Sequence, residues 1–180
     1  NDTDATAMRR DIDDMQYMID SYLDFARGEG GEEYSRQNLW QFVEEYIISR
    51  SWGELAIEFG DEVELYSNIK SQSFGRALAN IISNADKYAD KVLITVRSEK
   101  GDNIIEIEDN GEGVADKDKK KLFKPFYRQD TARNIHKHAS VGLGLSITKE
   151  IILGHNGAVS LHNSKKLGGL LVRIFLPASK

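Results

Sequence analysis

The chain has 180 residues, of which 40% are hydrophobic and 29% are charged, and this composition is typical of one folded domain with a short additional element. It contains no cysteine, which excludes disulfide scaffolds, thiol nucleophiles and zinc or iron–sulfur sites with cysteine ligands. No stretch approaches the roughly 18 apolar residues that a membrane span requires.

The net charge of −5 is concentrated at the start of the chain. Residues 1–30 carry eight acidic and three basic residues, whereas residues 31–180 carry equal numbers of both kinds. Because two electrostatically different parts suggest a boundary, we expect an N-terminal element at 1–30 and a domain at 31–180.

The N-terminal element has the pattern of one long amphipathic helix. Residues 2–27 contain neither Gly nor Pro, and glycines at positions 28, 30 and 31 end the helix. Its apolar residues recur at alternating spacings of four and three: Met8, Ile12, Met15, Ile19, Tyr22 and Ala26. One helix cannot bury such a stripe by itself. We therefore expect part of a larger helical bundle, with packing on the chain's own domain as the alternative.

The rest of the chain alternates between helical and strand patterns, which predicts an α+β fold. We expect a two-layer α/β sandwich in which a mixed sheet of about five strands packs on three helices, preceded by the long helix. In chain order we first expect a strand at 34–37, a helix capped by Asn38, and strands at 55–59 and 63–66 around a turn at 60–61. A helix at about 71–89 and strands at 91–99 and 103–109 follow. The last expected elements are a short helix with a loop within 116–127, a helix at about 142–153, and a hairpin of 158–163 with 170–176.

The helix expected at 71–89 carries two different faces. One is apolar and would face the sheet: Phe74, Leu78, Ile81 and Ala85. The other places Asn80, Asn84 and Lys87 in register. Asn is a poor interior helix former, so a solvated polar face and a ligand-binding face are both open interpretations.

Two glycine motifs follow, each directly next to an expected element. Asp109, Gly111 and Gly113 come after an apolar strand, where glycines allow the backbone to approach a flat ligand. The run Gly142, Leu143, Gly144 and Leu145 opens a helix, where backbone N–H groups can bind an anion. Ordinary turns explain each motif equally well when it is taken alone.

Taken in order, these motifs resemble the catalytic domain of sensor histidine kinases, whose ATP-binding (Bergerat) fold is shared with gyrase, Hsp90 and MutL. The matching segments are Asn80–Tyr88 for the N box, Asp109–Gly113 and Gly142–Leu145 for the two glycine boxes, and Phe123–Arg128 for the F box. Within this family, residues 122–133 and 24–27 are most similar to the osmosensor (EnvZ-like) group.

The resemblance implies ATP and Mg²⁺ as ligands and assigns polar residues to the phosphates. Asn84 ligates Mg²⁺ through its amide oxygen, and Asn80 supports the phosphates or the waters of the metal. Lys87 neutralises phosphate charge, Arg128 reaches the γ-phosphate, and the backbone of residues 142–145 holds the phosphates.

The resemblance also assigns residues to the adenine. Tyr88 covers the base, and Asp109 accepts a hydrogen bond from the adenine amino group. Gly111 and Gly113 admit the flat ring.

The implied reaction is transfer of the ATP γ-phosphoryl group to a histidine, followed by relay to an aspartate of a response regulator. Gyrase-like ATPases have a water-activating Glu at the position of Asn80, and an amide cannot act as that base. Residues 1–27 contain no histidine and resemble the second helix of a dimerisation hairpin. We therefore expect a fragment that binds ATP, hydrolyses it negligibly and does not autophosphorylate, because its phosphoacceptor helix is absent.

The family further implies a homodimer in the full-length protein and a location as the cytoplasmic portion of a bacterial inner-membrane sensor. Membrane contact would come only from the missing N-terminal part. Residues 116–137, which include the expected ATP lid, carry eight basic and three acidic groups. They could attract nucleotide or form a solvated loop, and the lack of a wider basic face argues against nucleic-acid binding.

Two other functions fit the same fold. One is an anti-sigma-type serine kinase, against which the long heptad helix argues. The other is a nucleotide-free interaction domain, against which the intact motif residues argue. His136 and His138 lie in the expected lid, and Ser140 stands where the family often has glycine.

Overall fold

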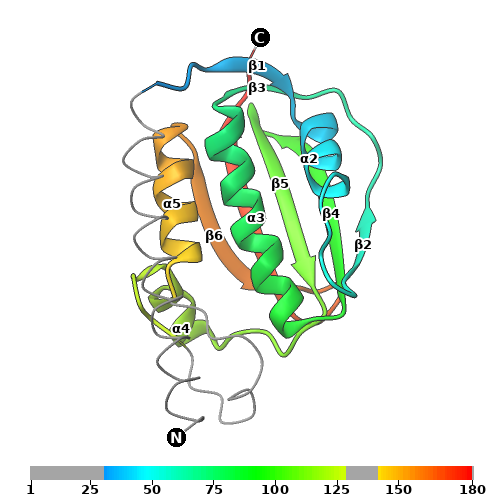
Figure 1. Ribbon diagram of the computed structural model, residues 1–180, viewed down its shortest axis with the longest axis vertical. Helices are drawn as coiled ribbons and strands as arrows, with labels where there is room; N and C mark the ends of the chain where they lie inside the picture. Colours follow the sequence, from blue (N-terminus) through cyan, green and yellow to red (C-terminus); the bar gives the residue numbers. More distant parts are fainter. Residues whose placement is uncertain (1–30, 129–141, 180) are drawn as a thin grey trace, which may run out of the picture.

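The computed structural model describes residues 31–128 and 142–179, and within these ranges a five-stranded mixed sheet forms one layer and helices form the other. Figure 1 shows α2, α3 and α5 side by side on one face of the sheet. The sheet order is β2 (Ala56–Phe59), β4 (Lys91–Glu99), β5 (Asp102–Asp109), β7 (Leu170–Pro177) and β6 (Ala158–Asn163), and the helices are α2 (Leu39–Ile48), α3 (Ser71–Tyr88) and α5 (Gly144–Gly154). The expected two-layer α+β architecture is confirmed.

Smaller elements complete the described part of the chain. Strands β1 (Ser35–Asn38) and β3 (Tyr66–Ile69) pair antiparallel in a separate two-stranded sheet. The basic segment forms α4 (Asp116–Lys119) and a 3₁₀ turn (Lys121–Phe123), as expected of a short helix with a loop. Across 31–128 and 142–179, no helix combines the length and apolarity of a membrane span. The helix predicted over 2–27 and the element at 1–30 lie outside the described residues.

The core lies between the sheet and the apolar faces of its helices. The predicted inner face of α3 is buried, with at most 3% of each residue exposed: Phe74, Leu78, Ile81 and Ala85. Alternate residues of β4 meet it from the sheet: Val92, Ile94 and Val96. Burial of each large aliphatic or aromatic side chain contributes about 1.5–3 kcal/mol, so this contact fixes α3 on the sheet.

The two strands expected on either side of a turn at residues 60–61 do not pair with each other, and the second of them lies later in the chain than predicted. Strand β2 pairs parallel with β4, with Ala56 opposite Lys91, instead of turning back on itself. The next strand begins only at Tyr66 and pairs with β1. It is held there from the far end of the chain, because the Ser67 hydroxyl donates to the Pro177 carbonyl over 2.8 Å. A local turn pattern could not reveal these long-range partners.

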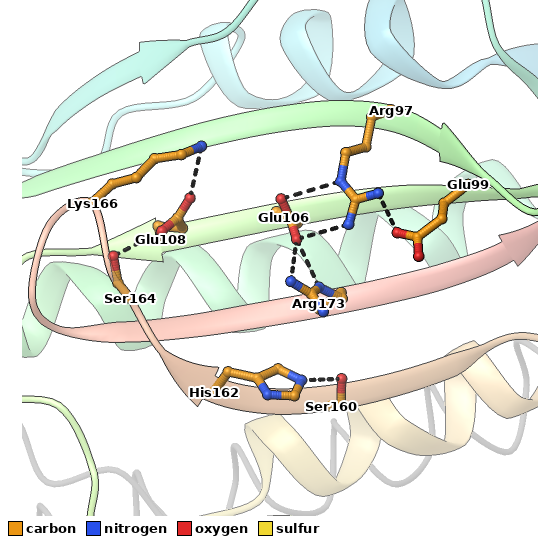
Figure 2. Close-up of polar contacts among 9 residues, drawn as sticks. All are labelled: Arg97, Glu99, Glu106, Glu108, Ser160, His162, Ser164, Lys166 and Arg173. Atoms are coloured by element: carbon orange, nitrogen blue, oxygen red, sulfur yellow. Dashed lines mark hydrogen bonds and ion pairs between the residues drawn. The ribbon is translucent and has the colours of Figure 1, made fainter.

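The face of the sheet opposite α2, α3 and α5 carries a cluster of polar side chains that are bonded across strands (Figure 2). Glu106 on β5 accepts hydrogen bonds from Arg97 on β4 and from Arg173 on β7, the latter at 2.7 Å from Nε. Burial opposes ionisation of Glu106, but the two arginines outweigh it and hold the pKa of this carboxyl below its usual value. Glu108 is likewise paired with Lys166. These contacts pair the buried carboxylates with cations from neighbouring parts of the same face.

A buried imidazole joins the end of α5 to the start of α3. His155 is 4% exposed, and its Nδ1 donates to the Ile151 carbonyl over 2.7 Å. Its Nε2 accepts from the backbone N–H of Lys70 over 3.0 Å, which requires a neutral ring. Burial lowers the pKa of His155 below its usual value.

The buried ring makes stability depend on pH in a defined direction. Because the pKa of His155 is lower in the folded state than in the unfolded state, the unfolded chain takes up a proton first as the pH falls through about 6.5. The contribution of the neutral ring to the free energy of unfolding is therefore fully present above that pH. Below it, the free energy of unfolding decreases by at most about 1.4 kcal/mol per pH unit. Urea unfolding at pH 8.0 and 5.5 measures this loss, and His155→Gln, which cannot titrate, should remove most of it. An equal pH dependence in wild type and variant would contradict this assignment.

Candidate functional site

The sequence-predicted site residues gather at one end of the two-layer structure. Figure 1 shows that α3 and β5 end there and that α5 begins there. Because α3 and α5 run in opposite directions over the same face of the sheet, the last turn of α3 lies at the same end as the first turn of α5. Polar residues from the last two turns of α3 thus meet the glycine-rich segments at Asp109–Gly113 and Gly142–Leu145.

The polar face of α3 borders the start of α5. Asn80 and Asn84 are half-buried, and a side chain at Gly144 would begin 3.6 Å from the Cβ of Asn80. That distance is an ordinary van der Waals contact, so the structure places the N box next to the second glycine box. The Nδ2 atom of Asn80 is buried and has no hydrogen-bond partner among the described residues. A buried donor of this kind fits a ligand that supplies an acceptor oxygen.

Asp109 closes β5 with a carboxylate held by two backbone donors. Its Oδ1 accepts from the N–H groups of Gly111 and Leu170, each over 2.9 Å. Burial raises the pKa of Asp109, and these two hydrogen bonds oppose the rise. Among the described residues, Oδ2 has no hydrogen-bond donor. One oxygen is thus used to orient the group, and the other can accept from a ligand.

Gly169 is a site residue that sequence reasoning missed. Its position was predicted only as part of a hairpin turn. The antiparallel pairing of β5 with β7 brings it beside Asp109, where its N–H donates to the Asp109 carbonyl over 3.0 Å. A Cβ at this position would overlap the Asp109 carboxylate and lie 2.6 Å from the Gly111 nitrogen. No local pattern reports this contact, since the two residues lie 60 positions apart in the chain.

Asn110 is a second missed residue, although it lies inside the predicted motif. Its Oδ1 accepts from the backbone N–H groups of Asp90 and Lys91, over 3.0 and 2.9 Å. Gly111 also packs against this connection, since a Cβ there would lie 2.6 Å from the Tyr88 carbonyl. These contacts fix the first glycine box against the end of α3, beside Tyr88, which is 51% exposed. An Asn within a turn is the signal that could have indicated this role.

The second glycine box begins before its helix. Helix α5 starts at Gly144, not near residue 142 as predicted, because Gly142 adopts a left-handed conformation with φ of +76°. Its carbonyl accepts from the N–H of Phe126 over 3.1 Å, which joins the F box to the second glycine box. Leu143 precedes the helix as its N-cap, and Leu145 is buried in the core.

The structure places the remaining predicted residues around this site. Lys87 is half-buried in the last turn of α3, Gly113 adopts a left-handed φ of +70° near Gly169, and Arg128 is exposed at the end of the range 31–128. His136, His138 and Ser140 lie outside the described residues.

The oxygen donors of this site suit a metal only together with a ligand. Within 31–128 and 142–179, no group of three or more His, Asp and Glu side chains could hold a metal. Mg²⁺, however, takes few ligands from protein and the rest from phosphates and water. The amide oxygen of Asn84 is a hard donor on the face that borders α5. The residues present therefore fit a magnesium ion that arrives with a phosphorylated ligand.

Comparison with known proteins assigns the described domain to a family. Residues 69–180 match the family described as histidine kinase-, DNA gyrase B-, and HSP90-like ATPase. The chain is 38% identical over 117 residues to the sensor histidine kinase CpxA of Escherichia coli (strain K12). This alignment covers 64% of the chain but only 25% of CpxA. The chain thus spans about a quarter of that relative.

Solved structures agree with this assignment. The histidine kinase domain of the E. coli osmosensor EnvZ matches with a TM-score of 0.62 and 32% identity, over 84% of this chain and 93% of that domain. The ATP-binding domain of PrrB from Mycobacterium tuberculosis matches with a TM-score of 0.67 over 83% of this chain and all of that domain. At 22% identity the latter supports the fold alone. The resemblance predicted from the four motifs is confirmed.

A side chain at Gly169 would disturb its close contact with Asp109 and lower the free energy of unfolding. Gly169→Ala should lower the free energy of unfolding by about 2 kcal/mol or more, because the added methyl group overlaps buried carboxylate and backbone atoms. Gly154→Ala is the matched control, since a Cβ there meets nothing within 4 Å. Chemical denaturation of both variants provides the measurement, and equal stabilities would show that the β5–β7 end tolerates a side chain.

Proposed function

The chain belongs to the histidine kinase-, DNA gyrase B- and HSP90-like ATPase family, and we propose that residues 31–180 form the ATP-binding catalytic domain of a two-component sensor histidine kinase. Residues 1–30 would be the second helix of its dimerisation hairpin. The observation that carries the proposal is the orientation of Asp109: two backbone donors hold Oδ1, and Oδ2 has no hydrogen-bond donor among the described residues.

The proposed adenine contact follows from that geometry. A carboxylate oxygen accepts from the exocyclic amino group of adenine, whereas guanine has a carbonyl oxygen at that position. Burial strengthens this discrimination, because an unpaired polar group is costly away from water. The flat ring is proposed to lie beside Gly111 and Gly113, and Gly111 itself packs on the carbonyl of Tyr88 at the end of α3.

The phosphates are proposed to lie between α3 and the start of α5. Backbone N–H groups at 142–145 and the buried Nδ2 of Asn80 supply donors there. Asn84 would hold Mg²⁺, which neutralises phosphate charge when it is bound. Lys87 and Arg128 would add positive charge, with Arg128 at the γ-phosphate.

Transfer to a protein histidine is favoured over transfer to water. Breaking the bond between the γ-phosphorus and its bridging oxygen releases ADP, and a new bond joins phosphorus to an imidazole nitrogen of the acceptor, whose ring proton passes to solvent. Asn80 cannot take a proton from water, so this position does not supply the base that hydrolysis needs. The acceptor histidine would lie on a dimerisation helix outside this chain, since residues 1–30 contain no histidine.

The same proposal covers partners and location. The phosphoryl group would pass to an aspartate of a response regulator, and the full-length protein would be a homodimer. CpxA is named as a sensor histidine kinase and EnvZ as an osmosensor, which supports a role in sensing. In the proposal, an N-terminal part anchors the full-length protein in the inner membrane and this domain lies in the cytoplasm. An anti-sigma-type serine kinase and a nucleotide-free interaction domain are the outcomes that the experiments below would distinguish.

Nucleotide binding tests the role of Asp109. We expect ADP with Mg²⁺ to bind to the wild type and Asp109→Asn to weaken binding at least about tenfold, because the amide presents a donor to the adenine amino group while its oxygen can still hold the backbone. Isothermal titration measures both affinities, with GDP as the ligand control and Asp102→Asn, at the exposed start of the same strand, as the protein control. A folded wild type that binds no ADP would leave only the nucleotide-free function.

Incubation with γ-labelled ATP tests the reaction type. We expect no label on this chain and ATP turnover far below one per second, because the acceptor histidine and a general base are both absent from the proposed positions. Adding the separate dimerisation hairpin of a relative should restore weak transfer. Rapid hydrolysis that is lost in Asn84→Ala would instead place the chain among the ATPases of this family, and label on a serine of a partner would indicate the serine kinase.

A further inference from the structure

The turn between β6 and β7 lies beside the carboxylate that is proposed to bind adenine. It covers residues 164–169, and Leu170 begins β7. The N–H of Leu170 donates to Oδ1 of Asp109 over 2.9 Å, and the second donor to this oxygen is the N–H of Gly111. One of the two donors that orient the carboxylate therefore comes from the end of the turn. The position of the turn decides whether Leu170 reaches Asp109.

Glu108 holds the same turn from the other face of β5. Successive residues of a strand point to opposite faces, so Glu108 and Asp109 leave β5 in opposite directions. Figure 2 shows Ser164 and Lys166 next to Glu108. The hydroxyl of Ser164 donates to Oε2 of Glu108 over 2.8 Å, and the ammonium of Lys166 lies 3.2 Å from Oε1. Two consecutive carboxylates of β5 therefore contact the turn and its end, one on each face of the sheet.

Ser164 is the residue that connects the parts of this turn. Its hydroxyl oxygen accepts from the N–H of Leu167 over 2.9 Å, and its backbone N–H donates to the Gly169 carbonyl over 2.8 Å. Ser164 is 5% exposed and Glu108 is 3% exposed, so their hydrogen bond is shielded from water and has a carboxylate as its acceptor. The side chain of Lys166 is 55% exposed, and an ion pair in contact with water contributes little. The hydroxyl contact is thus the stronger of the two.

We propose that Ser164 and Glu108 are positioning residues of the nucleotide site, because their hydrogen bond holds the β6–β7 turn where the N–H of Leu170 orients Asp109. With two donors on Oδ1, the other oxygen of Asp109 has a fixed direction. A turn released from Glu108 loses the Leu170 donor, and the carboxylate then adopts further orientations that do not fit an adenine amino group. The affinity for the ligand falls in proportion to the fraction of chains in the competent orientation. The inference rests on the proposed function in its choice of adenine as the ligand.

Ser164→Ala tests the contact directly, because it removes the hydroxyl and leaves the backbone of the turn intact. Without nucleotide, amide hydrogen exchange at Leu170 should become at least about tenfold faster. ADP with Mg²⁺ should bind about three- to tenfold more weakly in isothermal titration. Lys166→Met, which removes only the exposed ion pair, should change both quantities by less than about twofold.

Ser67→Ala is the matched control for a general loss of stability. Ser67 on β3 is 1% exposed, and its hydroxyl also donates one hydrogen bond, to the Pro177 carbonyl, and accepts one, from the side-chain amide of Asn103. These contacts lie near the start of β5, whereas Asp109 ends that strand. Ser67→Ala should therefore lower the free energy of unfolding as Ser164→Ala does, but accelerate exchange at Leu170 less and change the affinity for ADP by less than about twofold.

A double variant tests whether Ser164 acts through Asp109. In the Asp109→Asn background, adding Ser164→Ala should change the affinity for ADP by less than about twofold, because the carboxylate that the turn orients is already replaced. A loss of stability alone would not produce this non-additivity, since it would weaken binding equally in both backgrounds.

Two results would overturn the proposal. One is that Ser164→Ala and Ser67→Ala have the same exchange at Leu170 and the same affinity for ADP. The other is a full additional loss of affinity in the Asp109→Asn background. Exchange at Leu170 needs no nucleotide, so a chain that binds no ADP contradicts the proposed function, while exchange still shows whether the turn orients Asp109. If Ser164→Ala fails to fold by circular dichroism, Glu108→Gln weakens the same hydrogen bond by removing the charge of its acceptor and takes its place in every measurement.

Discussion

The packing of α3 on the sheet is the constraint on which the rest of the structure depends. Its inner face, from Phe74 to Ala85, is almost completely excluded from water, and this fixes the rotation of the helix about its own axis. Once that rotation is fixed, the face with Asn80 and Asn84 has only one possible direction, toward the start of α5. The hydrophobic packing on one face of α3 therefore determines where the polar residues on its other face lie.

The backbone builds most of the proposed site. Asp109 is oriented by N–H groups from the glycine loop and from β7, and Asn110 fixes that loop to the end of α3. Close approach between these segments requires glycine at Gly111 and Gly169, where a Cβ would meet backbone or carboxylate atoms. A preorganised carboxylate of this kind needs no rearrangement to accept a hydrogen bond from a ligand.

The two ends of α3 have different tasks. Its last turns carry the proposed nucleotide residues, whereas its first turn is capped by Glu32 from the segment that enters the domain. Helix α5 runs the other way, with Gly144 at the nucleotide end and Gly154 under the Tyr34 hydroxyl. A rigid pair of helices thus lies between the place where ligand is proposed to bind and the place where the chain arrives, while the opposite face of the sheet is bonded through Glu106 and its two arginines (Figure 2).

The sequence by itself determined the fold class, the buried face of α3 and the family, because periodicity and ordered motifs are local properties that a single strand or helix displays. It also identified Asp109 and the two glycine boxes as candidates. Only the tertiary structure decided that β2 pairs with β4, that β3 begins at Tyr66, that Gly169 packs on Asp109 and that Glu32 caps α3. The physical reason is the same in each case: these contacts join residues far apart in the chain, and the hydrogen bonds or close packing that select them come into being only when the core brings the segments together.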